Sequence, residues 1–203
     1  DALGPAMWSP LHESCAEHNH EVALVLLRAG ADLHAWNSEG NTAVHLVCTN
    51  NYDTYGDDML MILGALGGSF EDVNAAGQTP LHRAIQQGAG WDLVEVLHEF
   101  CPTLDWSPKD DEGNTPLHYI PDGTSANFAF LLKNGADANA RNDEGDTPLH
   151  VFVLECDALV LSDGTHSSGM KCITSLFQAG VSLCAKNEYG YTPMDIAISR
   201  ATF

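Results

Sequence analysis

The sequence contains few positive charges. Its 203 residues include 8 Lys and Arg against 28 Asp and Glu, which gives a formal net charge of −20 with His neutral. Affinity for a phosphate backbone depends on Lys and Arg that displace counterions, so this composition argues against a nucleic-acid-binding protein. It also argues against adsorption to an anionic membrane. A protein partner with a basic segment is the ligand that an acidic surface favours.

Long apolar runs and closely paired cysteines are also missing. Runs such as 22–27 are far shorter than the roughly 20 residues of a membrane helix, so we expect no membrane insertion. The six cysteines form no C-x-x-C pair. We interpret them as small buried residues of a reducing compartment, the cytoplasm or the nucleus, and expect neither a metal nor a cofactor. Hydrophobic residues still make up 44%, enough for a folded core.

One tetrapeptide recurs along the chain. It reads S-P-L-H at 9–12, T-A-V-H at 42–45, T-P-L-H at 79–82, 115–118 and 147–150, and T-P-M-D at 192–195. The intervals between successive copies are 33, 37, 36, 32 and 45 residues. A Ser or Thr oxygen accepts from free amides at a helix start, and Pro suits the first helical position. Each copy therefore predicts the beginning of a helix.

These motifs, together with L-L-x-x-G-A-D at 26–32 and 131–137, resemble the ankyrin repeat. The resemblance implies an all-α solenoid of stacked helix-turn-helix units with hairpin-like finger loops, and it extends over a single, monomeric domain, 1–203. The expected repeats are 7–39, 40–76, 77–112, 113–144, 145–189 and a partial repeat 190–203. It also implies that the motif histidines hydrogen-bond neighbouring turns. His18 stands where the family has Gly, so we expect a left-handed backbone there.

The pattern departs from the family in four places. Extra residues at 51–58 and 157–169 are expected to be surface loops between paired helices. Pro121 follows Thr115 by six residues and predicts an inner helix that ends early. After the last motif, we expect either a polar cap formed by Asp195, Ser199 and Arg200, or the continuation of a longer array. The chain starts without Met, which we interpret as a domain taken from a longer protein.

By resemblance, the domain is a non-catalytic protein–protein interaction module that binds its partner through the concave inner-helix face and the fingers. The expected contact residues are Trp36, Asn37, Ser38, Glu39, Arg83, Gln86, Trp106, Asp110, Asp111, Tyr119, Arg141, Asn142, Asp143, Leu154 and Tyr189. The two tryptophans suit either a binding hot spot or packing within the protein. Carboxylates that recur at the fingers predict an acidic rim, with a solvated surface serving solubility alone as the alternative.

Two further interpretations concern the rest of the protein and its chemistry. One is that the array serves as a platform domain inside a larger enzyme, effector or channel. The motifs of nucleophilic, phosphate-binding and zinc enzymes are missing, so we predict no enzyme activity. The weaker alternative is catalysis from Asp163, His166, Ser167 and Ser168 in the insertion of repeat five.

A modification is the last prediction. The repeat pattern places five residues at the bases of the fingers: His34, Asn74, Asp105, Asn139 and Cys184. Asn74 and Asn139 each follow a Leu by eight residues and an Asp by two. This spacing resembles the pattern that the asparaginyl hydroxylase of animals modifies in ankyrin domains, so both are candidate hydroxylation sites.

Overall fold

The computed structural model describes residues 7–49, 56–88, 91–119, 125–155 and 167–201. Regular secondary structure in these ranges is helical throughout, with no strand. The chain forms two compact units, residues 1–104 (unit 1) and 105–203 (unit 2), and each is described by itself. The predicted all-α fold is confirmed.

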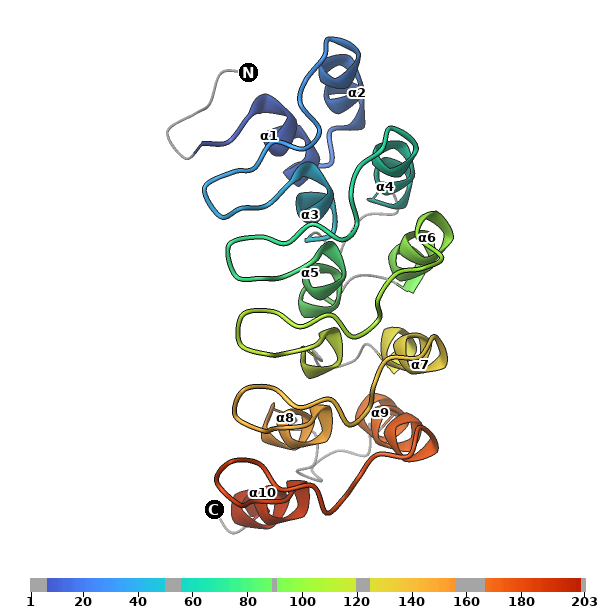
Figure 1. The fold of residues 1–203 in the computed structure, drawn as a ribbon. Helices are drawn as coiled ribbons and strands as arrows, with labels where there is room; N and C mark the ends of the chain where they lie inside the picture. The colour runs from blue at the N-terminus through green and yellow to red at the C-terminus, as the bar shows by residue number, and fades with distance from the viewer. Residues whose placement is uncertain (1–6, 50–55, 89–90, 120–124, 156–166, 202–203) are drawn as a thin grey trace. The chain divides into compact units, whose positions relative to one another are not determined.

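Unit 1 stacks three pairs of helices. Its helices are α1 (Pro10–Ala16), α2 (His20–Arg28), α3 (Ala43–Val47), α4 (Gly56–Ala65), α5 (Pro80–Gln86) and α6 (Trp91–Phe100). The short inner helices α1, α3 and α5 form one layer, and the longer outer helices α2, α4 and α6 form the other (Figure 1). Contacts run within each pair and between α1 and α3, α3 and α5, and α4 and α6.

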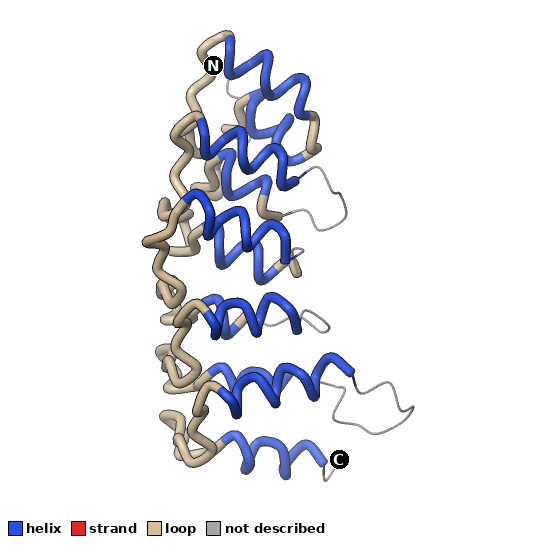
Figure 2. Tube along the Cα trace, turned by 90° about the vertical axis from the view of Figure 1, so that its right-hand side faces the viewer, coloured by secondary structure: helices blue, strands red, loops and turns tan. Residues whose placement is uncertain are grey.

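Unit 2 repeats this arrangement with a shortened first pair. It contains the 3₁₀ helix η1 (Pro116–His118), α7 (Ser125–Lys133), α8 (Pro148–Glu155), α9 (Ser167–Gln178) and α10 (Pro193–Ala201). The prediction of an early helix end before Pro121 is confirmed, because only three residues of this inner helix form. In each unit, the loops that lead from an outer helix to the next inner helix gather at one end of the helices (Figure 2).

The motif histidines connect successive repeats. The Thr42 N–H donates to His45 Nδ1 at 3.2 Å, so the proton lies on Nε2, which donates to the Gln78 carbonyl at 3.0 Å. The same ring nitrogen of His118 and His150 lies 3.1 Å from a carbonyl of the following repeat, and that of His12 lies 2.9 Å from the Ala35 carbonyl in the finger of its own repeat. Their structural role is confirmed. The left-handed backbone at His18 is confirmed as well, with φ 51°.

The burial of His45 makes the stability of the protein depend on pH. Desolvation lowers the pKa of its imidazole to about 4, although the bond to Gln78 opposes the shift. Burial lowers the pKa of His12 and His118 in the same direction. The unfolded chain therefore binds protons below pH ~6.5 that the native state does not, so stability is full above that pH and falls towards pH 4.

We expect His45 alone to account for up to about 3 kcal/mol of unfolding free energy lost between pH ~6.5 and ~4. Urea unfolding across this range, compared with His45→Gln, measures the contribution. The variant should be less stable at pH 7 and should lose part of the pH slope. Identical slopes for the two proteins would contradict the assignment.

The last helix exposes side chains that are buried elsewhere. Leu11, Val44, Leu81, Leu117 and Leu149 occupy the third motif position and are buried, whereas Met194 is 58% exposed. Ile198 is exposed to the same extent. In the other repeats an outer helix covers this face, and none follows α10 in the described residues. Asp195 and Ser199 are exposed beside them, so the exposed face of α10 is mixed. The side chain of Arg200 lies outside the described residues, and the polar cap and the longer array both stay predictions.

Buried cysteines behave largely as predicted. Cys15 and Cys48 are fully buried, and desolvation raises the pKa of each thiol to about 12, which makes them unreactive at neutral pH. Cys172 is buried too. Cys101 is half-buried and Cys184 is exposed, so the prediction fails for these two.

Candidate protein-interaction surface

Each finger loop is held by one Asn or Asp side chain and one glycine. In the first finger, Asn37 Oδ1 accepts from the N–H groups of Glu39 and Asn41, both at 2.9 Å. Gly40 has φ 73°, and its N–H donates to the Asn37 carbonyl at 3.0 Å. Asn74, Asp110, Asn142 and Asn187 make the same pair of side-chain bonds in the other fingers. We call these five residues the frame residues.

Hydrogen bonds also join neighbouring fingers within each unit. In unit 1, the Ala75 N–H donates to the Glu39 carbonyl at 2.9 Å. In unit 2, the N–H of Asp143 donates to the Glu112 carbonyl at 3.0 Å, and the N–H of Glu188 donates to the Glu144 carbonyl at 2.9 Å. The fingers of each unit are thus ordered supports for the side chains that they display.

The frame explains why some predicted contact residues have little free surface. Asn37 is 4% exposed and Asp110 is 8% exposed. Asp110 also accepts a hydrogen bond from the Tyr119 hydroxyl, which ties a predicted groove residue to the finger. Asn142 is half-buried and donates to Asn114 Oδ1 at 2.9 Å. Contrary to the prediction, these side chains mainly shape the loops and offer a partner little area.

The frame also corrects one alignment. Asn74 is a frame residue, three positions before its finger glycine, whereas Asn139 lies six positions before its own. Asn139 Oδ1 accepts from the Ser182 N–H at 2.7 Å, and its amide donates to the Gly180 carbonyl at 3.2 Å. The two asparagines are therefore not equivalent, and the residue that corresponds to Asn139 is Glu71. Hydroxylation of Asn74 or Asn139 stays a prediction.

The two tryptophans differ in the same way. Trp36 is 62% exposed, four residues before Gly40. Trp106 is 7% exposed, and its ring meets Phe130 edge-on with the centroids 5.8 Å apart. It lies seven residues before its finger glycine, as the buried Leu33 and Phe70 do. The number of residues between each tryptophan and its finger glycine is therefore the sequence signal that separates the two. It predicts that Trp106 packs in the interior and that Trp36 is exposed.

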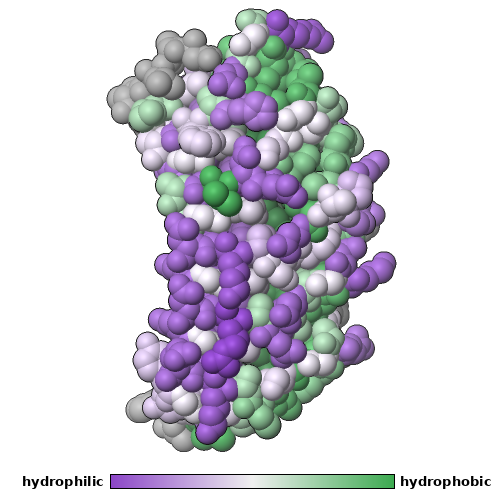
Figure 3. All heavy atoms as spheres, viewed as in Figure 1, coloured by the Kyte–Doolittle hydropathy of each residue, from purple (hydrophilic) through white to green (hydrophobic). Residues whose placement is uncertain are grey.

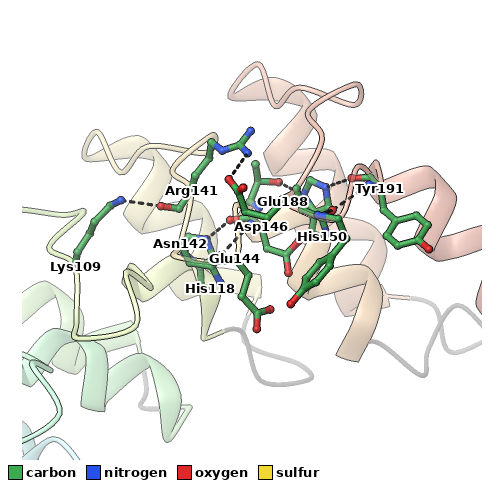
Figure 4. Close-up of polar contacts among 12 residues, drawn as sticks. Lys109, His118, Arg141, Asn142, Glu144, Asp146, His150, Glu188 and Tyr191 are labelled. Atoms are coloured by element: carbon green, nitrogen blue, oxygen red, sulfur yellow. Dashed lines mark hydrogen bonds and ion pairs between the residues drawn. The ribbon is translucent and has the colours of Figure 1, made fainter.

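The finger tips of unit 2 carry most of the exposed finger charge. Of the six exposed residues in the two positions after each frame residue, five are acidic, Asp111, Glu112, Asp143, Glu144 and Glu188, and the sixth is Tyr189. The position before each frame residue is basic: Lys109, Arg141 and Lys186. Lys109 Nζ donates to the Arg141 carbonyl at 2.7 Å, and the Arg141 guanidinium lies 3.9 Å from Glu188 Oε1 (Figure 4). The finger surface of unit 2 therefore carries more acidic than basic side chains, and the basic ones lie between the acidic ones in the sequence.

Unit 1 presents a different finger surface. The residues that follow its frame positions are Ser38, Glu39, Ala75 and Ala76, with a single carboxylate. The positions that are basic in unit 2 hold the exposed apolar residues Trp36 and Val73. On α5, Arg83 donates to Gln86 Oε1 at 3.1 Å, and both side chains are half-buried. Hydrophilic residues accordingly gather over the finger side of unit 2 (Figure 3).

A pocket of about 410 Å³ lies in unit 2 between the last two fingers and helices α8 and α10. Leu154 and Tyr189, both predicted contact residues, line it together with Tyr191 and Ile196. Glu144 and Asp195 add carboxylates. Tyr191 and Asp195 were not among the predicted contact residues: the sequence pattern did not single out Tyr191, and it placed Asp195 in the repeat motif and the expected polar cap.

Within the described ranges, no cluster of three or more His, Cys, Asp or Glu has the arrangement of a metal site. No helix there is both long and apolar enough to cross a membrane. Asp163 and His166, the alternative catalytic residues, lie outside those ranges, as do the side chains of Ser167 and Ser168. The catalytic alternative is therefore untested.

Family comparisons agree with this geometry. The model "Ankyrin repeats (3 copies)" matches residues 55–142, and the model "Ankyrin repeat" matches residues 7–38. The chain belongs to the ankyrin-repeat family. Ankyrin repeats are protein-interaction modules, and the recognition made from the sequence is confirmed.

Relatives of this ankyrin-repeat chain are diverse. It is 32% identical over 186 residues to a Caenorhabditis elegans homologue of transient receptor potential cation channel subfamily A member 1, covering 77% of the chain and 14% of the relative. It is 26% identical over 193 residues to the mouse B-cell lymphoma 3 protein homologue, covering 95% and 40%. The chain thus spans less than half the length of either relative.

A solved structure shares the fold. The crystal structure of the ankyrin repeat domain of Bcl-3, a member of the IkappaB protein family, matches with a TM-score of 0.71 and 25% sequence identity. The match covers 98% of this chain and 82% of the Bcl-3 chain.

Proposed function

We propose that this chain is a non-catalytic ankyrin-repeat module that uses the finger face of unit 2 to bind a basic segment of a protein partner. The supporting observation is the row of five exposed carboxylates that follows the frame residues, against three exposed bases in the preceding positions. Like-signed charges on an ordered support steer an oppositely charged segment towards the surface. Because the finger backbones are already hydrogen-bonded, little conformational freedom is lost there on binding.

The interspersed bases have a role in this proposal. Lys109, Arg141 and Lys186 form a second row beside the carboxylates, so a partner must place its own charges in register with both rows. Like charges brought together oppose a wrong register. We therefore propose a basic segment that also carries one or two acidic or polar positions.

We also propose that the module serves as a platform within a larger intracellular protein. The match to the channel relative covers only 14% of it, and the match to the Hydra tyrosine-protein kinase HTK16 covers 13% of that protein. The matched segment of each is thus one part of a longer chain. Free thiols at Cys15 and Cys48 suit a reducing compartment, the cytoplasm or the nucleus.

Reversing finger charges should weaken this binding. We expect the double variant Asp111→Lys, Asp143→Lys to bind a fluorescein-labelled peptide of five Arg-Ser-Leu units about tenfold more weakly than wild type at low salt. Neither side chain belongs to the frame or lines the pocket. Fluorescence anisotropy at low and physiological salt measures the affinity, and the difference should shrink as salt screens the charges.

A matched control changes net charge equally elsewhere. Glu21→Lys, Glu95→Lys reverses two exposed carboxylates on α2 and α6, outside the fingers. Its affinity should stay within about twofold of wild type, because charges that are not part of the contact surface act only through screened, long-range attraction. An equal loss in both double variants would show a general charge effect and overturn the proposed site.

A further inference from the structure

The pocket of unit 2 combines aromatic, apolar and acidic walls. Leu154 and Ile196 line it from helices α8 and α10, and Tyr189 and Tyr191 line it from the last finger. Both tyrosine side chains are largely exposed, and Ile196 is buried. Glu144 of the preceding finger and Asp195 of α10 also line it. The pocket thus offers a ligand aromatic faces, an aliphatic surface and the exposed carboxylates of Glu144 and Asp195, and the buried Asp146 also belongs to its lining.

The backbone that carries the two rings is held at several points. Asn187 Oδ1 accepts from the N–H groups of Tyr189 at 3.1 Å and Tyr191 at 3.0 Å. The Tyr191 carbonyl accepts from the Asn187 N–H at 3.0 Å and from His150 Nε2 at 3.1 Å, as Figure 4 shows for His150. Asn187 Nδ2 donates to Asp146 Oδ1 at 2.8 Å. The finger therefore presents both tyrosines before any ligand arrives.

The charge of the pocket selects for a cation. Asp195 Oδ2 accepts from the N–H and the hydroxyl of Thr192, both at 2.8 Å, and these bonds lower the pKa of its carboxyl group. It is ionised at neutral pH. Lys186 lies near enough to favour the ionised form but does not line the pocket. Among the described residues that line the pocket there is no Lys or Arg.

An arginine side chain matches these features better than a lysine does. Its guanidinium is flat and weakly hydrated, so it stacks on aromatic faces and pairs with carboxylates at the same time. Its methylene groups bury against aliphatic surface such as Leu154. We infer that this pocket binds an arginine side chain of the partner's basic segment. This inference rests on the proposed function and adds to it the type of side chain that the pocket binds.

Titration with blocked amino acids tests the pocket without a known partner. We expect Nα-acetyl-arginine methylamide to shift the Ile196 methyl signal in a saturable way, with a low-millimolar dissociation constant suited to so small a ligand. The citrulline counterpart has nearly the same shape without the charge and should bind at least about tenfold more weakly. The lysine counterpart should also bind more weakly. Arginine and citrulline binding equally, or lysine matching arginine, would overturn the inference.

Variants localise the effect. Tyr191→Ala should weaken arginine binding about tenfold, because it removes a stacking face and leaves the backbone carbonyl that His150 contacts. Phe177→Ala removes another exposed aromatic ring, on α9 and outside the pocket lining, and should bind as wild type does. Unchanged binding in Tyr191→Ala would overturn the inference. Circular dichroism melting checks that both variants fold.

The two proposals fail differently. If the Arg-Ser-Leu peptide responds to finger charge reversal but blocked arginine does not bind, the pocket inference is wrong and the finger surface stands. If the peptide is insensitive to finger charge reversal, the proposed function is wrong, whatever blocked arginine does at the pocket.

Discussion

Trp106→Ala should lower the free energy of unfolding by about 4 kcal/mol, whereas Trp36→Ala should change it by less than about 0.5 kcal/mol. Trp106 is buried against Phe130, so its removal loses apolar burial and leaves a cavity that the surrounding helices fill only in part. Trp36 is mostly solvated, so its truncation removes few contacts. Urea unfolding followed by far-ultraviolet circular dichroism measures both values.

The pair also separates packing from binding. If the fingers of unit 1 contact a partner, Trp36→Ala weakens that binding while stability is unchanged, as expected for an exposed aromatic anchor. Similar stability losses for the two variants would contradict the assignment of Trp106 to the interior and Trp36 to the surface.

Gly40→Ala should destabilise the protein by about 4 kcal/mol, and Gly30→Ala by only about 1 kcal/mol. Both glycines have positive φ, 73° and 88°, so each substitution carries the strain of a left-handed residue with a Cβ. At Gly40 the added Cβ would also lie 2.5 Å from Ala75 N and 3.0 Å from the carbonyl carbon of Asn74. At Gly30 it would meet nothing within 4 Å.

The difference between the two variants isolates the contact between fingers. To relieve the clash, the second finger must move away from the first, which lengthens the 2.9 Å bond from the Ala75 N–H to the Glu39 carbonyl. Urea unfolding of both variants measures the gap. Equal destabilisation would mean that the fingers separate at no cost, and that their hydrogen bonds do not order the displayed surface.

The structure shows where exposed acidic side chains concentrate on the fingers. The chain carries −20 overall, but the exposed finger positions of unit 1 hold one carboxylate where those of unit 2 hold five. The position before each frame residue also differs between the units. It is apolar in unit 1 (Trp36 and Val73) and basic in unit 2 (Lys109, Arg141 and Lys186). A repeat protein can vary these positions freely because they lie outside its hydrogen-bonded frame.

Much of the fold was predictable because its signals are local. A Thr or Ser before Pro begins a helix through atoms within four residues, and a glycine with positive φ ends each finger through its own backbone. The histidine network was predictable from the family resemblance. The exposure of the predicted contact residues was less predictable, because an Asn or Asp that caps a loop and one that faces solvent look the same in the sequence.

Local sequence patterns are enough to predict the repeat register, the helix starts, the early end of the fourth inner helix and the excess of acidic charge. Which side chains are exposed depends on the packed structure. Trp106 is buried by Phe130, 24 residues away, and the pocket brings together Glu144, Leu154, Tyr191 and Asp195 from two fingers and two helices. Burial depends on contacts between repeats, and these are absent from any local pattern of residues.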